Sequence, residues 1–123
     1  MNKFHFATDE EIVGLDQELC AKLDIAWGIA NAALRPTEVR FRLTSTTRGI
    51  HCGHSAHALG LAVDIGLGHL AEGFERDTQR WAIMHGLHGA GFKRIEEAPA
   101  HLHVDCGQPP DFPSPVQWIG KDA

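Results

Sequence analysis

The stretch LAVDIGL, residues 61–67, decides how the fold is interpreted, because it places one carboxylate inside a strongly apolar run. Side chains of a β-strand alternate between its two faces, so Leu61, Val63 and Ile65 are expected to point into a core. Asp64 then leaves the strand on the opposite face. An unpaired buried carboxylate is energetically costly, so Asp64 predicts a polar partner on that face.

A second stretch, HLHVDC at 101–106, alternates in the same way. Its polar side chains, His101, His103 and Asp105, share one face, and its apolar side chains share the other. If the two strands are neighbours in the sheet, His103 and Asp64 can meet on the same side.

The rest of the sequence predicts helices that pack against this sheet. In chain order it indicates a helix that follows a Thr-x-x-Glu capping box at Thr8–Glu11 and ends at Pro36, a half-buried strand at 39–45, a helix from Asp77 or Thr78 to about His88, and a strand at 92–96. Gly14 and Gly28 weaken the first helix, which is therefore expected to be broken or to start late.

The C-terminal segment, 108–123, is rich in proline and is expected to form an irregular strap that docks through Trp118. The strands at 92–96 and 101–106 are joined by a short connection, which favours a hairpin. The sequence therefore predicts a single domain over 1–123 of the α+β class. Its sheet is small and mostly antiparallel, with helices on one face.

The composition is that of a globular chain and predicts neither a nucleic-acid nor a membrane partner. The 123 residues carry a formal net charge of -5, with 43% hydrophobic and 22% charged residues, and Lys and Arg form no basic run. The sequence contains no transmembrane run and no pattern of a secretory signal, so we expect a chain that is cytoplasmic as synthesised. Phage origin, with release at lysis or association with a virion, is left open, as is the oligomeric state.

The three cysteines are an odd number, which favours a reduced chain in which each is a small buried hydrophobe. Cys52 and Cys106 flank the histidine-rich segments. Whether either of them touches a metal ion is left open by the sequence.

His57 completes a candidate set of metal ligands. It lies seven residues before Asp64, on the loop that enters the strand, and Gly60 would let that loop fold back closely. Two histidines and one carboxylate with a fourth position open form a catalytic zinc site, in which the metal lowers the pKa of water to about 7. With His103 as the second histidine, the spacing favours such a site.

These motifs resemble a known family. SAHALGLAVDI, at 55–65, is similar to the S-x-H-x-x-G-x-A-x-D signature of the zinc D-Ala-D-Ala carboxypeptidase and peptidoglycan endopeptidase family. HLHVD resembles that family's second motif, and the hedgehog signalling domain shares the fold and the motif set. The resemblance covers about residues 39–106 and implies a Zn²⁺ ion bound by His57, Asp64 and His103.

The general base differs between two branches that the motifs resemble. Many of the peptidases have an acidic residue three positions before the last zinc histidine, where this chain has Ala100. Hedgehog-like domains instead have a Glu six positions before that histidine and a His two positions before it, a pattern that Glu97 and His101 match. The resemblance thus implies Glu97 as the base. Glu96 is the competing candidate, since a shift of one residue reverses the facing on a strand.

Two further residues are assigned by the same resemblance. His51 stands where hedgehog-like domains have a His, and together with His101 it is expected to stabilise an oxyanion or to orient Glu97. STTRG, at 45–49, resembles the S-x-x-R turn of the peptidases, so Arg48 is expected to bind a substrate carboxylate.

Two functions of different classes follow from the resemblance. The first is a zinc-dependent peptidase that hydrolyses D-amino-acid-containing peptides of bacterial cell wall, as a D,D-carboxypeptidase or an endopeptidase. The second is a hedgehog-like module with a structural zinc ion, which acts by recognising a partner. Ala100 favours the module and Arg48 favours the enzyme. The sequence leaves open which bond would be cleaved.

Overall fold

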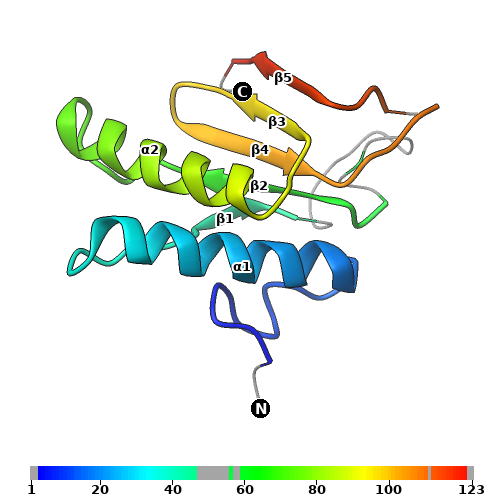
Figure 1. The fold of residues 1–123 in the computed structure, drawn as a ribbon, viewed down its shortest axis with the longest axis horizontal. Helices are drawn as coiled ribbons and strands as arrows, with labels where there is room; N and C mark the ends of the chain where they lie inside the picture. Colours follow the sequence, from blue (N-terminus) through cyan, green and yellow to red (C-terminus); the bar gives the residue numbers. More distant parts are fainter. Residues whose placement is uncertain (1–2, 47–55, 57–58, 111, 122–123) are drawn as a thin grey trace.

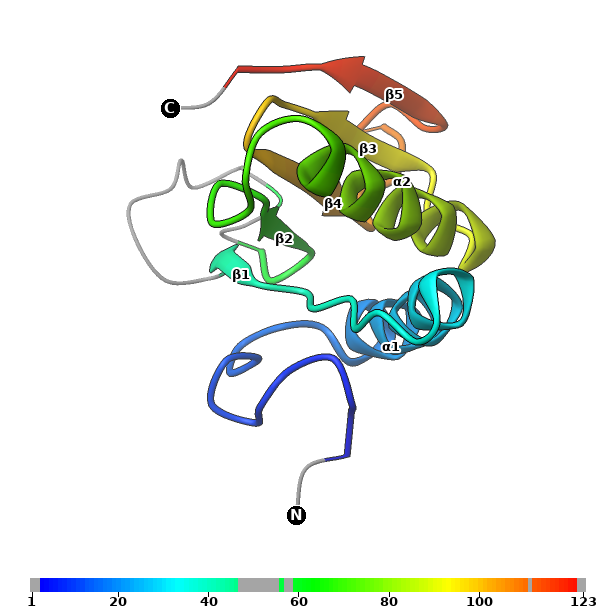
Figure 2. The same cartoon turned by 90° about the vertical axis from the view of Figure 1, so that its left-hand side faces the viewer.

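The computed structural model describes residues 3–46, 56, 59–110 and 112–121. In chain order the elements are α1 (Gln17–Leu34), β1 (Leu43–Ser45), β2 (Ala62–Gly66), α2 (Phe74–Gly89), β3 (Arg94–Glu97), β4 (His101–Asp105) and β5 (Val116–Ile119). The chain is α+β, and both helices cover the same face of a five-stranded sheet (Figures 1 and 2).

The strands lie in the order β1-β2-β4-β3-β5. β2 pairs antiparallel with both β1 and β4, and β3 pairs antiparallel with β4, whereas β5 runs parallel to β3. The predicted small and mostly antiparallel sheet is thus confirmed. Most important for the site, β2 and β4 are direct neighbours, which is the condition under which the sequence lets His103 and Asp64 meet.

The core fills the space between the helices and one face of the sheet. Fully buried apolar side chains of α1, α2, β2 and β4 meet there, including Leu23, Leu87, Ile65 and Leu102. The two helices cross closely, because a Cβ atom at Gly86 of α2 would overlap the backbone of Ala26 in α1. Val63 and Ile65 of β2 and Leu102 and Val104 of β4 therefore face the helices, and the polar positions of both strands face the other way.

α1 begins later than the capping box, as Gly14 suggested. The box is present, since Glu11 accepts a hydrogen bond from the backbone N–H of Thr8 at 2.9 Å, but it closes a turn and not a helix. Gly14 then adopts a φ of 83°, a left-handed conformation that a helix does not contain. The helix starts after Asp16, whose carboxylate accepts the N–H of Leu19 at 3.1 Å.

The strand predicted at 39–45 is shorter than expected. The strand covers only the last three residues, preceded by one bond from the N–H of Gly66 to the carbonyl of Arg42, although Val39 and Phe41 are buried as the alternation predicted. The side chain of Asn31 in α1 binds both backbone groups of Val39, donating to its carbonyl at 3.0 Å and accepting from its N–H at 2.8 Å. These bonds replace the strand ladder at that position.

The prediction of an irregular C-terminal strap is wrong for part of its length. Residues 116–119 form β5, which pairs parallel with β3 at the edge of the sheet (Figure 1). The expected docking through Trp118 is confirmed, because its indole N–H donates to Glu96 at 3.0 Å. At the other helix, α2 begins at Phe74, three residues before the predicted Asp77.

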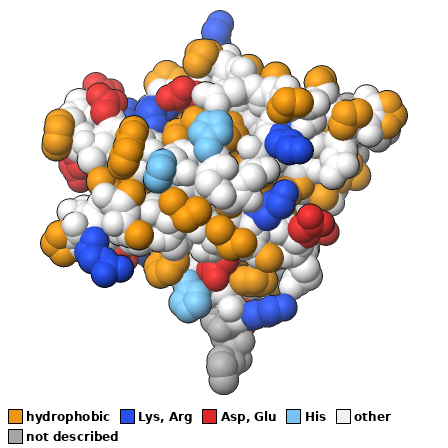
Figure 3. All heavy atoms as spheres, viewed as in Figure 1, with side chains coloured by type: hydrophobic (Ala, Val, Ile, Leu, Met, Phe, Trp, Pro, Cys, Tyr) orange, Lys and Arg blue, Asp and Glu red, His pale blue; other side chains and the backbone are white. Residues whose placement is uncertain are grey.

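The helix-covered side carries charged residues of both signs among apolar ones, with no broad patch of one sign (Figure 3). Within the part of the chain that the structure describes, neither helix has the length and apolar character needed to cross a membrane.

Candidate metal and catalytic site

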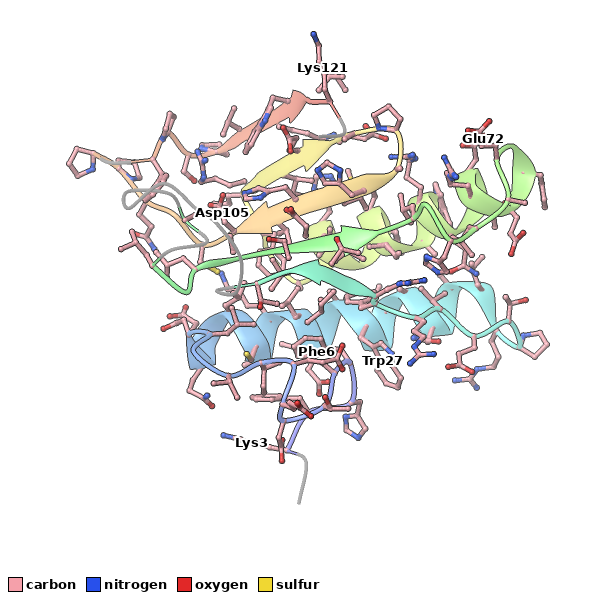
Figure 4. The ribbon with its side chains drawn as sticks, turned by 180° about the vertical axis from the view of Figure 1, so that it is seen from behind. Lys3, Phe6, Trp27, Glu72, Asp105 and Lys121 are labelled. Atoms are coloured by element: carbon pink, nitrogen blue, oxygen red, sulfur yellow. The ribbon has the colours of Figure 1, made fainter. Side chains whose placement is uncertain are left out.

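One row of residues crosses the sheet from edge to edge. The strand registers pair Ser45 with Asp64, Asp64 with His103, His103 with Glu96, and Glu96 with Trp118. Residues that are direct partners across neighbouring strands point to the same face. We call these five residues the polar row; they lie on the face away from the helices, which Figure 4 shows from behind.

Within the polar row the side chains contact one another. Nδ1 of His103 lies 3.0 Å from Oδ1 of Asp64, and the rings of His103 and Trp118 are 5.9 Å apart. The side chains of His103, Asp64 and Glu96 are 14%, 23% and 23% exposed. They are thus shielded enough to interact strongly and open enough to be reached from solvent.

His101 joins the row from one end of β4. Its Nε2 lies 3.4 Å from Oε1 of Glu96, whose other oxygen, Oε2, accepts the bond from Trp118. Both oxygens of Glu96 are therefore engaged, and the carboxylate is held beside His103 by residues from two other strands.

Asp105 contacts the second ring nitrogen of His103. Its Oδ2 lies 2.6 Å from Nε2, and its Oδ1 accepts bonds from Arg94 Nε at 2.6 Å and from the backbone N–H of Gly107 at 2.9 Å. Asp105 lies at the end of β4 (Figure 4), and its side chain is fully buried. The alternation of HLHVDC placed it on this face; its partner Arg94 carries no sequence signal, since the ion pair depends on strand register.

The charges around His103 set the protonation of this cluster. Burial lowers the pKa of His103, but the hydrogen bonds with Asp105 and Asp64 and their negative charge outweigh burial and raise the pKa to about 9. For Asp105 burial acts in the opposite direction and raises the pKa. The hydrogen bonds from His103, Arg94 and Gly107 outweigh burial and hold the pKa of Asp105 below its usual range. Without a metal ion the cluster is thus an imidazolium between carboxylates.

The distance between Asp64 and His103 and the types of their donor atoms are compatible with two of the ligands of a zinc ion. Ligands at about 2.0–2.2 Å from tetrahedral zinc are roughly 3.4 Å from each other. The observed separation of 3.0 Å between Nδ1 and Oδ1 is close to this value. An oxygen and an imidazole nitrogen are also donor types that zinc accepts. Among the described residues no group of three such side chains is arranged to hold a metal.

Several of the predicted site residues cannot be placed. His57, the expected third ligand, lies outside the described residues, as do His51, Arg48 and Cys52. Ala56 is described, and its carbonyl accepts the N–H of Leu61 at 2.9 Å.

Glu97, the predicted base, does not lie in the polar row. It pairs with the buried Leu102 and so faces the helices, where its carboxylate is 3.9 Å from Arg80 of α2. Arg80 also donates to the carbonyls of Ala98 and Pro99, which fixes the hairpin from behind. Of the two glutamates that the sequence left open, Glu96 is the one beside His103.

Cys106 follows β4 and packs against the core on the helix side. Burial raises the pKa of this thiol to about 11. This thiol packs on the core side of the sheet, whereas Asp64 and His103 lie on the other face.

A hollow of about 660 Å³ opens at the end of β4, beyond the polar row. Asp105, Arg94, Phe112 and Lys22 are among the residues that line it, whereas Asp64, His103 and Glu96 do not. Asp105 therefore separates the polar row from this hollow.

Comparison of the chain with family models, with curated proteins and with solved structures found no match. The functional argument below therefore depends on the motifs in the sequence and on the geometry of the polar row.

Proposed function

We propose that this chain is a zinc-dependent peptidase that hydrolyses D-amino-acid-containing peptides of bacterial cell wall, of the D,D-carboxypeptidase or endopeptidase type. One observation carries the proposal. The two widely separated motifs bring Asp64 and His103 into direct contact, and Glu96 stands next to them in the same row.

Asp64 and His103 are the described residues that would hold the metal ion, with His57 as the third ligand implied by the sequence. A bound zinc ion would polarise a substrate carbonyl and lower the pKa of water to about 7. The remaining steps fall to side chains of the chain itself.

Glu96 is positioned to act as the general base in place of Glu97. It is the direct partner of His103, so its carboxylate is on the side where the attacking water must stand. It would take the proton of that water and pass it to the leaving amine. His101, 3.4 Å from Glu96, would hold the carboxylate in place and donate to the oxyanion.

A matched pair of variants tests this assignment. We expect Glu96→Gln to lower the rate of hydrolysis by about 10²–10⁴-fold, the range typical of a lost general base, with zinc content unchanged. Glu97→Gln, one residue away on the opposite face, should change the rate by no more than about threefold. The measurement is product release from purified peptidoglycan and from D-Ala-D-Ala by the zinc-loaded protein, with a chelator and zinc re-addition as controls.

The result that would contradict the assignment is the reverse order. Full activity of the Glu96→Gln protein with loss of activity in Glu97→Gln would return the role of base to Glu97. If the zinc-loaded wild-type protein releases no product from either substrate, the proposed peptidase function is wrong.

A second candidate function is a zinc-binding module that recognises a partner without catalysis. It is favoured by Ala100 at the usual position of the base, and by the two contacts that already occupy the oxygens of Glu96. In that case zinc would be retained, chelation would lower the melting temperature, and neither substrate would be cleaved.

A further inference from the structure

The two carboxylates that contact His103 differ in how firmly they are held. Asp105 is completely buried and accepts bonds from His103, Arg94 and the N–H of Gly107. Asp64 has a side chain that is 23% exposed. Asp105 is thus held in one position by three bonds, and Asp64 is the carboxylate of the two that solvent reaches.

The imidazole of His103 is oriented by this difference. Its Nε2 is 2.6 Å from the fixed carboxylate of Asp105, and its Nδ1 is 3.0 Å from Asp64. A histidine that binds a metal ion usually donates its other N–H to a carboxylate or carbonyl, which fixes the ring and its tautomer. In a zinc-bound state of this kind, the N–H of His103 would belong at Nε2 and the lone pair at Nδ1.

Arg94 links Asp105 to the C-terminal segment. Besides Asp105 it donates to the carbonyl of Pro113 at 2.6 Å, and its guanidinium lies between the rings of Phe112 and Trp118, 5.2 Å and 5.1 Å away. Only 9% of the residue is exposed. Residues 112–118 therefore contact Arg94. Arg94 in turn donates to Asp105, and Asp105 contacts His103.

We propose that Asp105 and Arg94 are positioning residues for the metal site, and that the C-terminal segment acts on His103 through them. This inference rests on the proposed zinc site but not on any hydrolytic activity. Neither residue is a ligand: Asp105 sets which nitrogen of His103 is presented to the ion, and Arg94 keeps Asp105 in place.

Metal affinity of the full chain is the first test, measured by zinc titration against a competing chelator and by cobalt absorption spectra. We expect Asp105→Asn to weaken zinc binding by about 10–100-fold, the range typical of lost support behind a metal-binding histidine. Arg94→Met should weaken it in the same direction. Arg80→Met is the matched control, because Arg80 also binds carbonyls and a carboxylate but lies on the helix side of the sheet. Its zinc affinity should equal that of the wild type.

A second measurement on the wild type covers the case in which the variants fail to fold. Nitrogen-15 chemical shifts of the His103 ring should show the hydrogen on Nε2 and the lone pair on Nδ1 in the zinc-loaded protein. A general loss of stability would not move these shifts, so they report on positioning alone.

Two results overturn the inference: folded Asp105→Asn protein with wild-type zinc affinity, or a His103 ring whose Nε2 is the metal-bound nitrogen. Wild-type protein without zinc affinity overturns this inference together with the proposed peptidase. Zinc affinity that depends on Asp105, without cleavage of either substrate, supports the positioning role and removes only the peptidase.

Discussion

His103 is the residue at which the interactions of the site converge, because each ring nitrogen contacts a different aspartate. Arg94 and Asp105 form a buried ion pair beside His103. This pair stabilises the fold only when both of its charges are present. Removing one partner of such a pair typically costs about 3–5 kcal/mol, since a buried charge is left without its counterpart. The Asp105→Asn and Arg94→Met proteins are therefore expected to melt at lower temperature than the wild type, whatever their metal affinity.

The cysteines give a prediction at the same scale. Burial raises the pKa of Cys20 and of Cys106 to about 11, so at pH 8 the reactive thiolate is about 100-fold scarcer than for an ordinary cysteine. Alkylation by iodoacetamide at pH 8 should be correspondingly slow at both positions in the folded protein and fast after denaturation. Peptide mapping separates them from Cys52. Rapid labelling of Cys106 in the native state would contradict its place against the core.

The choice between Glu96 and Glu97 shows the limit of sequence reasoning about single residues. The alternation of side chains along a strand means that Glu96 and Glu97 face opposite sides of the sheet. It does not say which of the two faces the helices. That depends on the register of β3 against β4, which pairs Glu96 with His103 and Glu97 with Leu102. Asp64 and His103 were predictable because each is flanked by apolar residues that must point into the core.

At the scale of elements, the close crossing of α1 and α2 can be tested with two glycines. Gly86 touches the backbone of Ala26, so Gly86→Ala should destabilise the fold by about 1–3 kcal/mol through overpacking. Gly28 lies in α1 with open space around it, so Gly28→Ala should stabilise by about 0.5–1 kcal/mol. Thermal or urea unfolding of the two variants measures the difference. Equal effects of the same sign would contradict the helix packing described here.

Elements with a strong hydrophobic period were predictable from the sequence, and those defined by distant partners were not. The helices and β2, β3 and β4 follow from periodicity and turns, although neither helix begins at the predicted capping residue. β5 does not, because the prolines that precede it resemble a loop and its parallel partner β3 lies about twenty residues earlier. The loss of strand pairing at Val39 could not be predicted from the sequence either, because it depends on the side chain of Asn31 in α1.

At the scale of the whole molecule, a zinc ion that binds only the folded chain must stabilise it. An ion at a hundred times its dissociation constant adds about 2.7 kcal/mol to the free energy of unfolding. The melting temperature of the wild type should therefore rise by several degrees with zinc and fall again with a chelator. His103→Ala should show neither change, and His85→Ala, in an exposed position on α2, should behave as the wild type. A zinc-dependent rise in the His103→Ala protein would place the ion elsewhere.

The parallel pairing of β5 with β3 also has a consequence for the order in which the protein matures. Trp118 supplies the donor to Glu96 and one of the two rings near Arg94, yet it is synthesised after the other four strands of the sheet. A nascent chain can thus form the helices and the β2–β4 pair before this edge strand docks. The polar row is completed only when β5 docks, so a chain synthesised no further than β4 lacks the bond from Trp118 to Glu96 and one of the two rings near Arg94.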